Sequence, residues 1–268
     1  MVSNASSWFK VREIASKTWQ IEDDIVYCYV IEGSEKALLV DTGWGIGDLA
    51  GVVSELTTKP LVVINTHGHI DHVCGNYLYD GIYIHRDDVP LMQASFIAQS
   101  RAPIIERFPE ATLPPGFDKH AWVNARLRSI NPFVAPPAFE LGRRRIEVLE
   151  IPGHSPGSVC LLDEANRLLF TGDSITSGDI LMQLETSLSV STFLRSVTNL
   201  AAISGKVDYL IPSHGEAPIR PRVLRDLMDG LEKILAGTLK GVEHQSRFGR
   251  GLLARFGSCG VIYREDRL

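Results

Sequence analysis

Short apolar runs separated by turn residues open the chain. Between residues 8 and 40 these runs occupy residues 9–14, 18–21, 25–31 and 37–40. This alternation predicts an antiparallel meander. A helix is expected over about residues 48–56, and the β-branched apolar run at 61–64 is typical of a buried strand.

Helical periodicity replaces the strand pattern from residue 87 to about residue 131. Apolar side chains recur there at helical spacing, and prolines at positions 103, 109, 114 and 115 interrupt it. A second helical piece is predicted over roughly residues 118–130. Because strand-rich stretches flank this segment without a linker, we interpret residues 87–137 as a helical cap inserted into a single domain of residues 1–268.

Strands return in the second half of the chain. They are predicted at residues 139–141, 146–151, 159–163, 168–171 and 209–211. Amphipathic helices are expected over about 191–203 and 224–235, where Gly237 ends the second, and short strands follow Lys240.

Composition narrows the class of protein. The 268 residues are 44% hydrophobic and 22% charged, which is typical of a soluble globular chain. A formal net charge of −5 counts against a general nucleic-acid binder, so we interpret the basic residues at 143–145 and 220–225 as solvated surface. The N-terminus has no signal-peptide pattern and no apolar run approaches the roughly 20 residues of a membrane span, so a cytoplasmic location without membrane contact is expected.

Three imidazoles and a carboxylate follow the strand predicted at 61–64. They belong to His67, His69, Asp71 and His72, and Gly68 lets the loop turn them toward one region. Isolated histidines are commonly core or capping residues. So short a loop, however, could hardly supply the hydrogen bonds that four titratable groups need without a metal. The sequence therefore favours a metal site.

Further polar residues lie just past other predicted strands. They are Asp41, His154, Asp173 and His214. Asp41 could be a turn acceptor, a hydrogen-bond partner of a metal-binding histidine, or both. If the strands belong to two facing sheets, these groups can converge on one edge.

The motif that contains residues 67–72, His-Gly-His-Ile-Asp-His, closely resembles that of the metallo-β-lactamase superfamily. His154 in Pro-Gly-His-Ser-Pro-Gly, Asp173 in Thr-Gly-Asp and His214 in Ser-His-Gly fit the same family in the same order. The chain looks most similar to the hydrolase branch that holds glyoxalase II and the acyl-homoserine lactonases. The resemblance covers about residues 10–220 and implies an α/β fold, the four-layer αβ/βα sandwich.

The resemblance also implies a ligand set for two divalent metal ions. One ion would be held by His67, His69 and His154, and the other by Asp71, His72 and His214, with Asp173 bridging them. Asp71 and Asp173 would position the metal-bound hydroxide. Zinc is the expected metal, although iron or manganese suits the same ligands.

The expected function is hydrolysis of a small ester, thioester or lactone by attack of a metal-bridging hydroxide. The alternatives are a phosphodiesterase or nuclease on the same bimetal site, iron-dependent persulfide or oxygen chemistry, and a non-enzymatic zinc protein. Acidic net charge disfavours the nuclease, and seven ligands disfavour a closed structural zinc site. We expect a small-molecule substrate, no nucleic-acid or membrane partner, and a homodimer by default.

Overall fold

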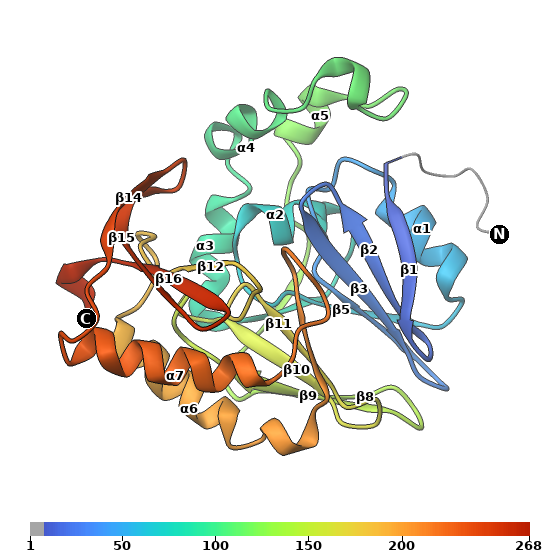
Figure 1. The fold of residues 1–268 in the computed structure, drawn as a ribbon. Helices are drawn as coiled ribbons and strands as arrows, with labels where there is room; N and C mark the ends of the chain where they lie inside the picture. Colours follow the sequence, from blue (N-terminus) through green and yellow to red (C-terminus); the bar gives the residue numbers. More distant parts are fainter. Residues whose placement is uncertain (1–7) are drawn as a thin grey trace. The chain divides into compact units, whose positions relative to one another are not determined.

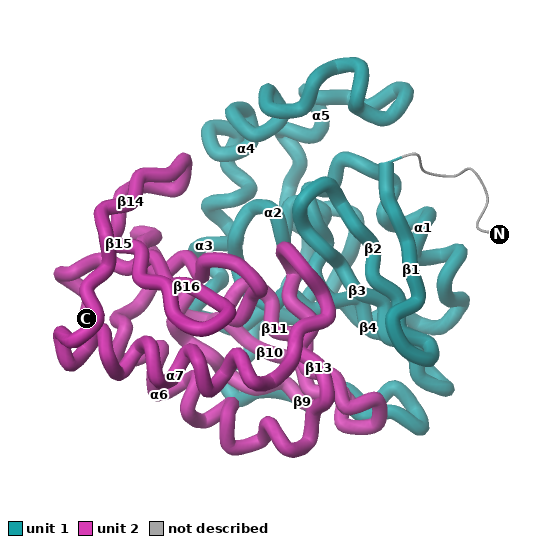
Figure 2. The backbone as a smooth tube through the Cα atoms, in the orientation of Figure 1, with its two compact units in different colours: residues 1–145 teal, residues 146–268 magenta. Residues whose placement is uncertain are grey.

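The computed structural model describes residues 8–268, in two compact units (Figure 2). The units are Met1–Arg145 and Ile146–Leu268. The interpretation of the first seven residues as free of a signal peptide lies outside the described residues.

A seven-stranded sheet forms the basis of the N-terminal unit, with strand order β1-β2-β3-β4-β5-β6-β7 (Figure 1). Strands β1 to β4 pair antiparallel, which confirms the predicted meander, and β4 to β7 pair parallel. The strands are β1 (Lys10–Ala15), β2 (Thr18–Asp23), β3 (Val26–Glu32), β4 (Ala37–Val40), β5 (Leu61–Ile64), β6 (Ile82–His85) and β7 (Ile130–Phe133).

Helix α1 (Leu49–Leu56) packs on this sheet. Asp48 caps its first turn by accepting a hydrogen bond from the backbone N–H of Gly51. Its buried face, which includes Leu49 and Val53, joins a cluster with the sheet residue Leu39. The predicted helix at 48–56 is therefore confirmed.

Short helices occupy most of the segment between β5 and β7. They are α2 (Ile70–Val73), α3 (Val89–Ala94), α4 (Ala98–Ile105), α5 (Lys119–Val123) and the 3₁₀ turns Cys74–Leu78, Arg86–Asp88 and Glu110–Thr112. The helix predicted over 118–130 is present but shorter, because α5 ends at Val123 and residues 130–133 form strand β7 beside β6. Asn131 precedes Pro132, which biases it toward extended backbone, and an edge strand tolerates the missing proline N–H. A cap over residues 87–137 stays a prediction.

A second sheet has strand order β13-β11-β10-β9-β8, in which β11 and β13 pair parallel whereas β10 pairs antiparallel with both β9 and β11. Its strands are β8 (Ala138–Glu140), β9 (Arg145–Glu150), β10 (Val159–Asp163), β11 (Leu168–Gly172) and β13 (Tyr209–Pro212). Helices α6 (Val190–Ala201) and α7 (Arg222–Leu235) lie side by side (Figure 1). Their apolar faces, including Val197 and Leu227, share one core with Leu169 of β11.

A third sheet, in the C-terminal unit, has order β12-β16-β15-β14. Its strands are β12 (Asp179–Leu181), β14 (Val242–Ser246), β15 (Gly249–Phe256) and β16 (Cys259–Tyr263), and the 3₁₀ turns Ser204–Lys206 and Glu265–Arg267 complete the unit. The short strands expected after Lys240 are confirmed, whereas β12 is not evident from the pattern. Among the described residues, no helix has both the length and the apolar character that a membrane crossing requires.

Candidate metal centre

The loop after β5 carries His67 and His69. Backbone packing shapes this loop, because the N–H of Gly68 donates to the buried Asp88 carboxylate at 2.7 Å. A Cβ on Gly68 would lie 2.6 Å from the Asp88 carbonyl oxygen, so only glycine fits. His69 is the N-cap residue of α2, and Asp71 and His72 lie within that helix.

Asp41, which directly follows β4, orients the imidazoles of His67 and His72 through hydrogen bonds. It is fully buried and has a left-handed backbone with φ of 61°, which aspartate tolerates better than most residues. One carboxylate oxygen accepts the N–H of Thr66 at 2.8 Å, and the other accepts the Thr66 hydroxyl at 2.8 Å and His72 Nδ1 at 2.9 Å. Because the single hydroxyl proton of Thr66 points to Asp41, His67 Nδ1 at 3.1 Å must be the donor to Thr66 Oγ1.

These bonds assign the tautomers of His67 and His72. In each ring Nδ1 carries the proton, so the Nε2 lone pair is the one that a metal would use. Asp41 therefore acts on His72 directly and on His67 through Thr66. This supports the prediction that Asp41 is a hydrogen-bond partner of a metal-binding histidine.

Backbone contacts hold the segment that follows His72. The His72 carbonyl accepts hydrogen bonds from the Thr42 hydroxyl at 3.1 Å and from Asn65 Nδ2 at 3.2 Å. Two residues later, the Cys74 carbonyl faces the guanidinium of Arg101 at 3.4 and 3.5 Å. The short helix that carries Asp71 and His72 is thus fixed at its C-terminal end.

Arg101 is fully buried in the same unit. Its guanidinium lies 4.1 Å from the ring centre of Trp122 and 4.9 Å from that of Phe96. Burial lowers the pKa of Arg101, and the two rings and the Cys74 carbonyl offset part of the cost of burying its charge. Burial also raises the pKa of the Cys74 thiol to about 12, in agreement with a packing role for that side chain.

The C-terminal unit supplies three further sequence-predicted residues, each from the loop after a strand. His154 follows β9, Asp173 follows β11 and His214 follows β13. His154 Nδ1 donates to the Leu181 carbonyl at 2.9 Å, which again assigns the lone pair to Nε2. The Ser187 hydroxyl donates to the His154 carbonyl at 2.9 Å.

Asp173 lies close to two histidines of its unit. One of its carboxylate oxygens is 3.3 Å from His214 Nε2, and the other is 3.7 Å from His154 Nε2. Each carboxylate oxygen of Asp173 therefore faces one imidazole.

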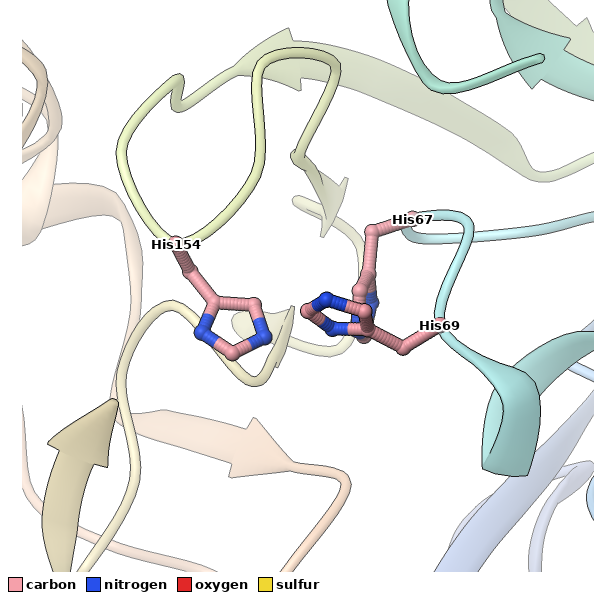
Figure 3. A group of neighbouring side chains, drawn as sticks. All are labelled: His67, His69 and His154. Atoms are coloured by element: carbon pink, nitrogen blue, oxygen red, sulfur yellow. The ribbon is translucent and has the colours of Figure 1, made fainter. Parts of the chain in front are cut away.

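Ligand atoms of the predicted residues approach one another in three groups. Within each group all atoms lie within 4.8 Å of one another, and the groups are His67, His69 and His154; His67, His72 and Asp173; and Asp71, His72 and His214. Figure 3 shows the three imidazole rings of the first group directed toward one another. The first group contains the same residues as one ligand set that the resemblance implies, and the third group contains the same residues as the other set. The second group combines Asp173 with one histidine from each of these two sets.

The donor chemistry fits a divalent metal ion. Neutral imidazole nitrogens and carboxylate oxygens are good ligands for zinc. Three of the seven side chains, those of His67, His72 and His154, are buried, and the other four are partly exposed. Structural zinc sites are usually closed by four ligands, whereas seven candidate ligands allow more than one ion with open positions.

Sequence reasoning missed the residues that orient this set. Thr66, Asp88 and Ser187 are ordinary polar residues in the sequence, and only the fold brings them to the candidate ligands. The three other histidines of the chain, His85, His120 and His244, belong to none of these groups. His85 caps a 3₁₀ turn by accepting the N–H of Asp87, and His120 is exposed in α5.

Comparison with known proteins identifies the family of this chain. The family model of the metallo-beta-lactamase superfamily matches residues 21–214, so the chain belongs to that superfamily. A metallo-beta-lactamase from Pontibacter korlensis has the same fold, with a TM-score of 0.58 and 17% identity over 84% of this chain and 99% of that one. The α/β fold expected from the resemblance is confirmed.

Two curated relatives narrow the class further. Acyl-coenzyme A thioesterase MBLAC2 from Homo sapiens is 26% identical over 203 residues, or 69% of this chain and 71% of its own. The probable polyketide biosynthesis zinc-dependent hydrolase PksB from Bacillus subtilis is 26% identical over 56% of this chain and 55% of its own. The chain is accordingly a hydrolase of the metallo-beta-lactamase superfamily.

Proposed function

We propose that this protein hydrolyses acyl thioesters with the help of two divalent metal ions and that the metal is zinc. The proposed ligands are His67, His69 and His154 for one ion, Asp71, His72 and His214 for the other, and Asp173 between them. The observation that carries the proposal is the approach of these ligand atoms to within 4.8 Å of one another in three overlapping groups.

The chain's own residues would prepare the site for hydrolysis. Two bound divalent ions would supply a water of lowered pKa and polarise the thioester carbonyl. Asp71 and Asp173 would offer carboxylate oxygens that position this water. Asp41 keeps His72 and His67 in the tautomer that presents Nε2, so the ligands need no rearrangement before a metal binds.

Thioesters are favoured as substrates over other carbonyl compounds. Acyl-coenzyme A thioesterase MBLAC2 shares this family, and the match covers more than two thirds of both chains. PksB, named as a zinc-dependent hydrolase, supports zinc. A cytoplasmic location, a small-molecule substrate and a homodimer belong to the same proposal, and the four buried free thiols suit a reducing compartment.

A substrate panel tests this function. Purified protein is assayed with acetyl-CoA, p-nitrophenyl acetate, an acyl-homoserine lactone and bis-p-nitrophenyl phosphate. We expect the highest kcat/KM for the thioester, loss of that activity with a chelator, and recovery on addition of zinc. His154→Ala should abolish the activity, and His120→Ala, which removes an exposed imidazole outside the set, should retain it. Preference for the phosphodiester, or thioesterase activity that survives both the chelator and His154→Ala, would contradict the proposal.

A further inference from the structure

A pocket in the C-terminal unit is lined in part by residues that closely follow two of the proposed ligands in the sequence. It has a volume of about 550 Å³, and its lining includes Ser177, Glu216, Ile219, Arg220, Arg222 and Ser258. Ser177 lies four positions after Asp173, and Glu216 lies two positions after His214. The walls of the pocket are therefore continuous with the loops that carry these two ligands.

Close packing holds these two loops together. The N–H of Glu216 donates to the Ser177 hydroxyl at 2.8 Å. Gly215 has φ of +75°, and a Cβ there would lie 2.6 Å from Ser177 Oγ, so glycine permits this approach. At the far end of the loop, Ile219 and Leu210 exchange two backbone hydrogen bonds of 2.9 Å. Hydrogen bonds at both ends therefore hold the loop that lines the pocket.

The charge of the pocket is set by two arginines. The Arg220 guanidinium lies 4.3 Å from the ring centre of Tyr209, a stacked arrangement that leaves its planar edge able to donate hydrogen bonds. Arg222 lies 4.0 Å from Asp226, at the limit of an ion pair. Arg220 also interacts electrostatically with Asp208, which forms an ion pair with Arg167 at 3.0 Å, and both arginines lower the pKa of that carboxyl.

Further positive charge comes from helix α7. The helix begins at Arg222, has no acidic residue in its first turn, and carries Arg225 one turn later. Glu216 is the opposing carboxylate in the lining. Three arginines thus lie in or next to the lining, and the carboxylates of Glu216, Asp226 and Asp208 are their counter-charges.

We propose that the pocket at Arg220 and Arg222 binds a phosphate on the thiol half of the thioester substrate. The inference rests on the proposed thioesterase function and specifies its substrate class: thioesters of a phosphorylated thiol, such as CoA or a phosphopantetheine arm. Guanidinium groups bind phosphate oxygens through paired charge-assisted hydrogen bonds, which an uncharged thiol half cannot form. Arg220 and Arg222 then determine specificity and take no part in the chemical step.

Three thioesters that differ in phosphate content test this assignment. They are S-acetyl-pantetheine, S-acetyl-phosphopantetheine and acetyl-CoA. In the double variant Arg220→Gln/Arg222→Gln, the kcat/KM ratio of phosphorylated to unphosphorylated substrate should fall about tenfold or more, mainly through KM. Glu216→Gln should raise that ratio because it removes the opposing charge. Arg195→Gln, an exposed charge-matched change on α6, should leave the ratio as it is.

Equilibrium binding separates the possible failures. Calorimetric titration with CoA should give a Kd about tenfold weaker for the double variant than for the wild-type chain, independently of turnover. An unchanged substrate ratio together with an unchanged Kd would overturn the phosphate site while the thioesterase function stands. Inactivity of the wild-type chain on all three thioesters would overturn the proposed function, and the CoA titration would still decide whether the arginines bind phosphate.

Discussion

Replacement of Asp41 by asparagine tests how the candidate ligands are oriented. The change preserves the size of the side chain but removes its charge. The carbonyl oxygen of the new side chain would stay toward the Thr66 N–H, which donates to Asp41 at 2.8 Å. The new amide NH₂ would then face the Thr66 hydroxyl and His72 Nδ1, both of which donate to Asp41 in the structure. The amide N–H groups would then face two other hydrogen-bond donors. The His72 ring could accept a hydrogen bond from the amide only if its proton moved from Nδ1 to Nε2.

The expected magnitude follows from the number of imidazoles affected. Loss of one hydrogen-bond partner behind a ligand typically weakens metal binding by about 10–100-fold, or about 1.4–2.8 kcal/mol. Asp41 acts on His72 directly and on His67 through Thr66, so we expect an effect toward the upper end of that range.

Competitive zinc titration with a chromophoric chelator measures this change. Asp48→Asn provides the matched control, because Asp48 caps α1 and asparagine caps as well as aspartate. Circular dichroism should show that both variants fold. Zinc affinity of Asp41→Asn within about twofold of the wild-type value would refute the assignment of Asp41 to ligand orientation.

Three other perturbations probe the site and the unit around it. His69→Ala should lose bound metal together with activity, and unchanged metal content in that variant would refute its assignment as a ligand. Arg101→Ala should lower the free energy of unfolding by about 2–4 kcal/mol in urea denaturation, because it empties a space between Trp122 and Phe96, and a loss under about 0.5 kcal/mol would show that the buried arginine contributes little. Burial raises the pKa of Asp23 from 3.8 to about 7, although hydrogen bonds from Trp8 and Trp44 lower that pKa in part. The folded chain thus holds this proton more tightly than the unfolded chain, so the stability it contributes is full below about pH 4 and is lost as the pH rises toward 7. Asp23→Asn should reduce this decline in urea denaturation between about pH 4 and pH 8, and an identical pH profile would contradict the raised pKa.

Local sequence patterns were sufficient to predict most strands and the candidate ligands. The run at 61–64 is short, apolar and β-branched, and the fold uses it as β5, which leads directly into His67. The candidate ligands are recognisable because histidine and aspartate directly after strands are chemically distinctive. The meander and the two amphipathic helices of the C-terminal unit follow from the same periodicity.

Features that depend on tertiary contacts could not be predicted in this way. Strand β7 contains a proline and forms through pairing with β6, so its sequence gives no strand signal of its own. β12 has only three residues and pairs in parallel with β16, about 80 residues later. Thr66 and Ser187 are chemically unremarkable, and their role appears only when the fold places them beside His67 and His154.

Metal stoichiometry decides whether this protein holds a two-ion centre. The purified chain is saturated with zinc, dialysed against metal-free buffer, and analysed for zinc by mass spectrometry alongside thioester hydrolysis. Two zinc ions per chain, with activity that rises as both sites fill, is the predicted result. One ion or none per chain in a folded and active protein would contradict it.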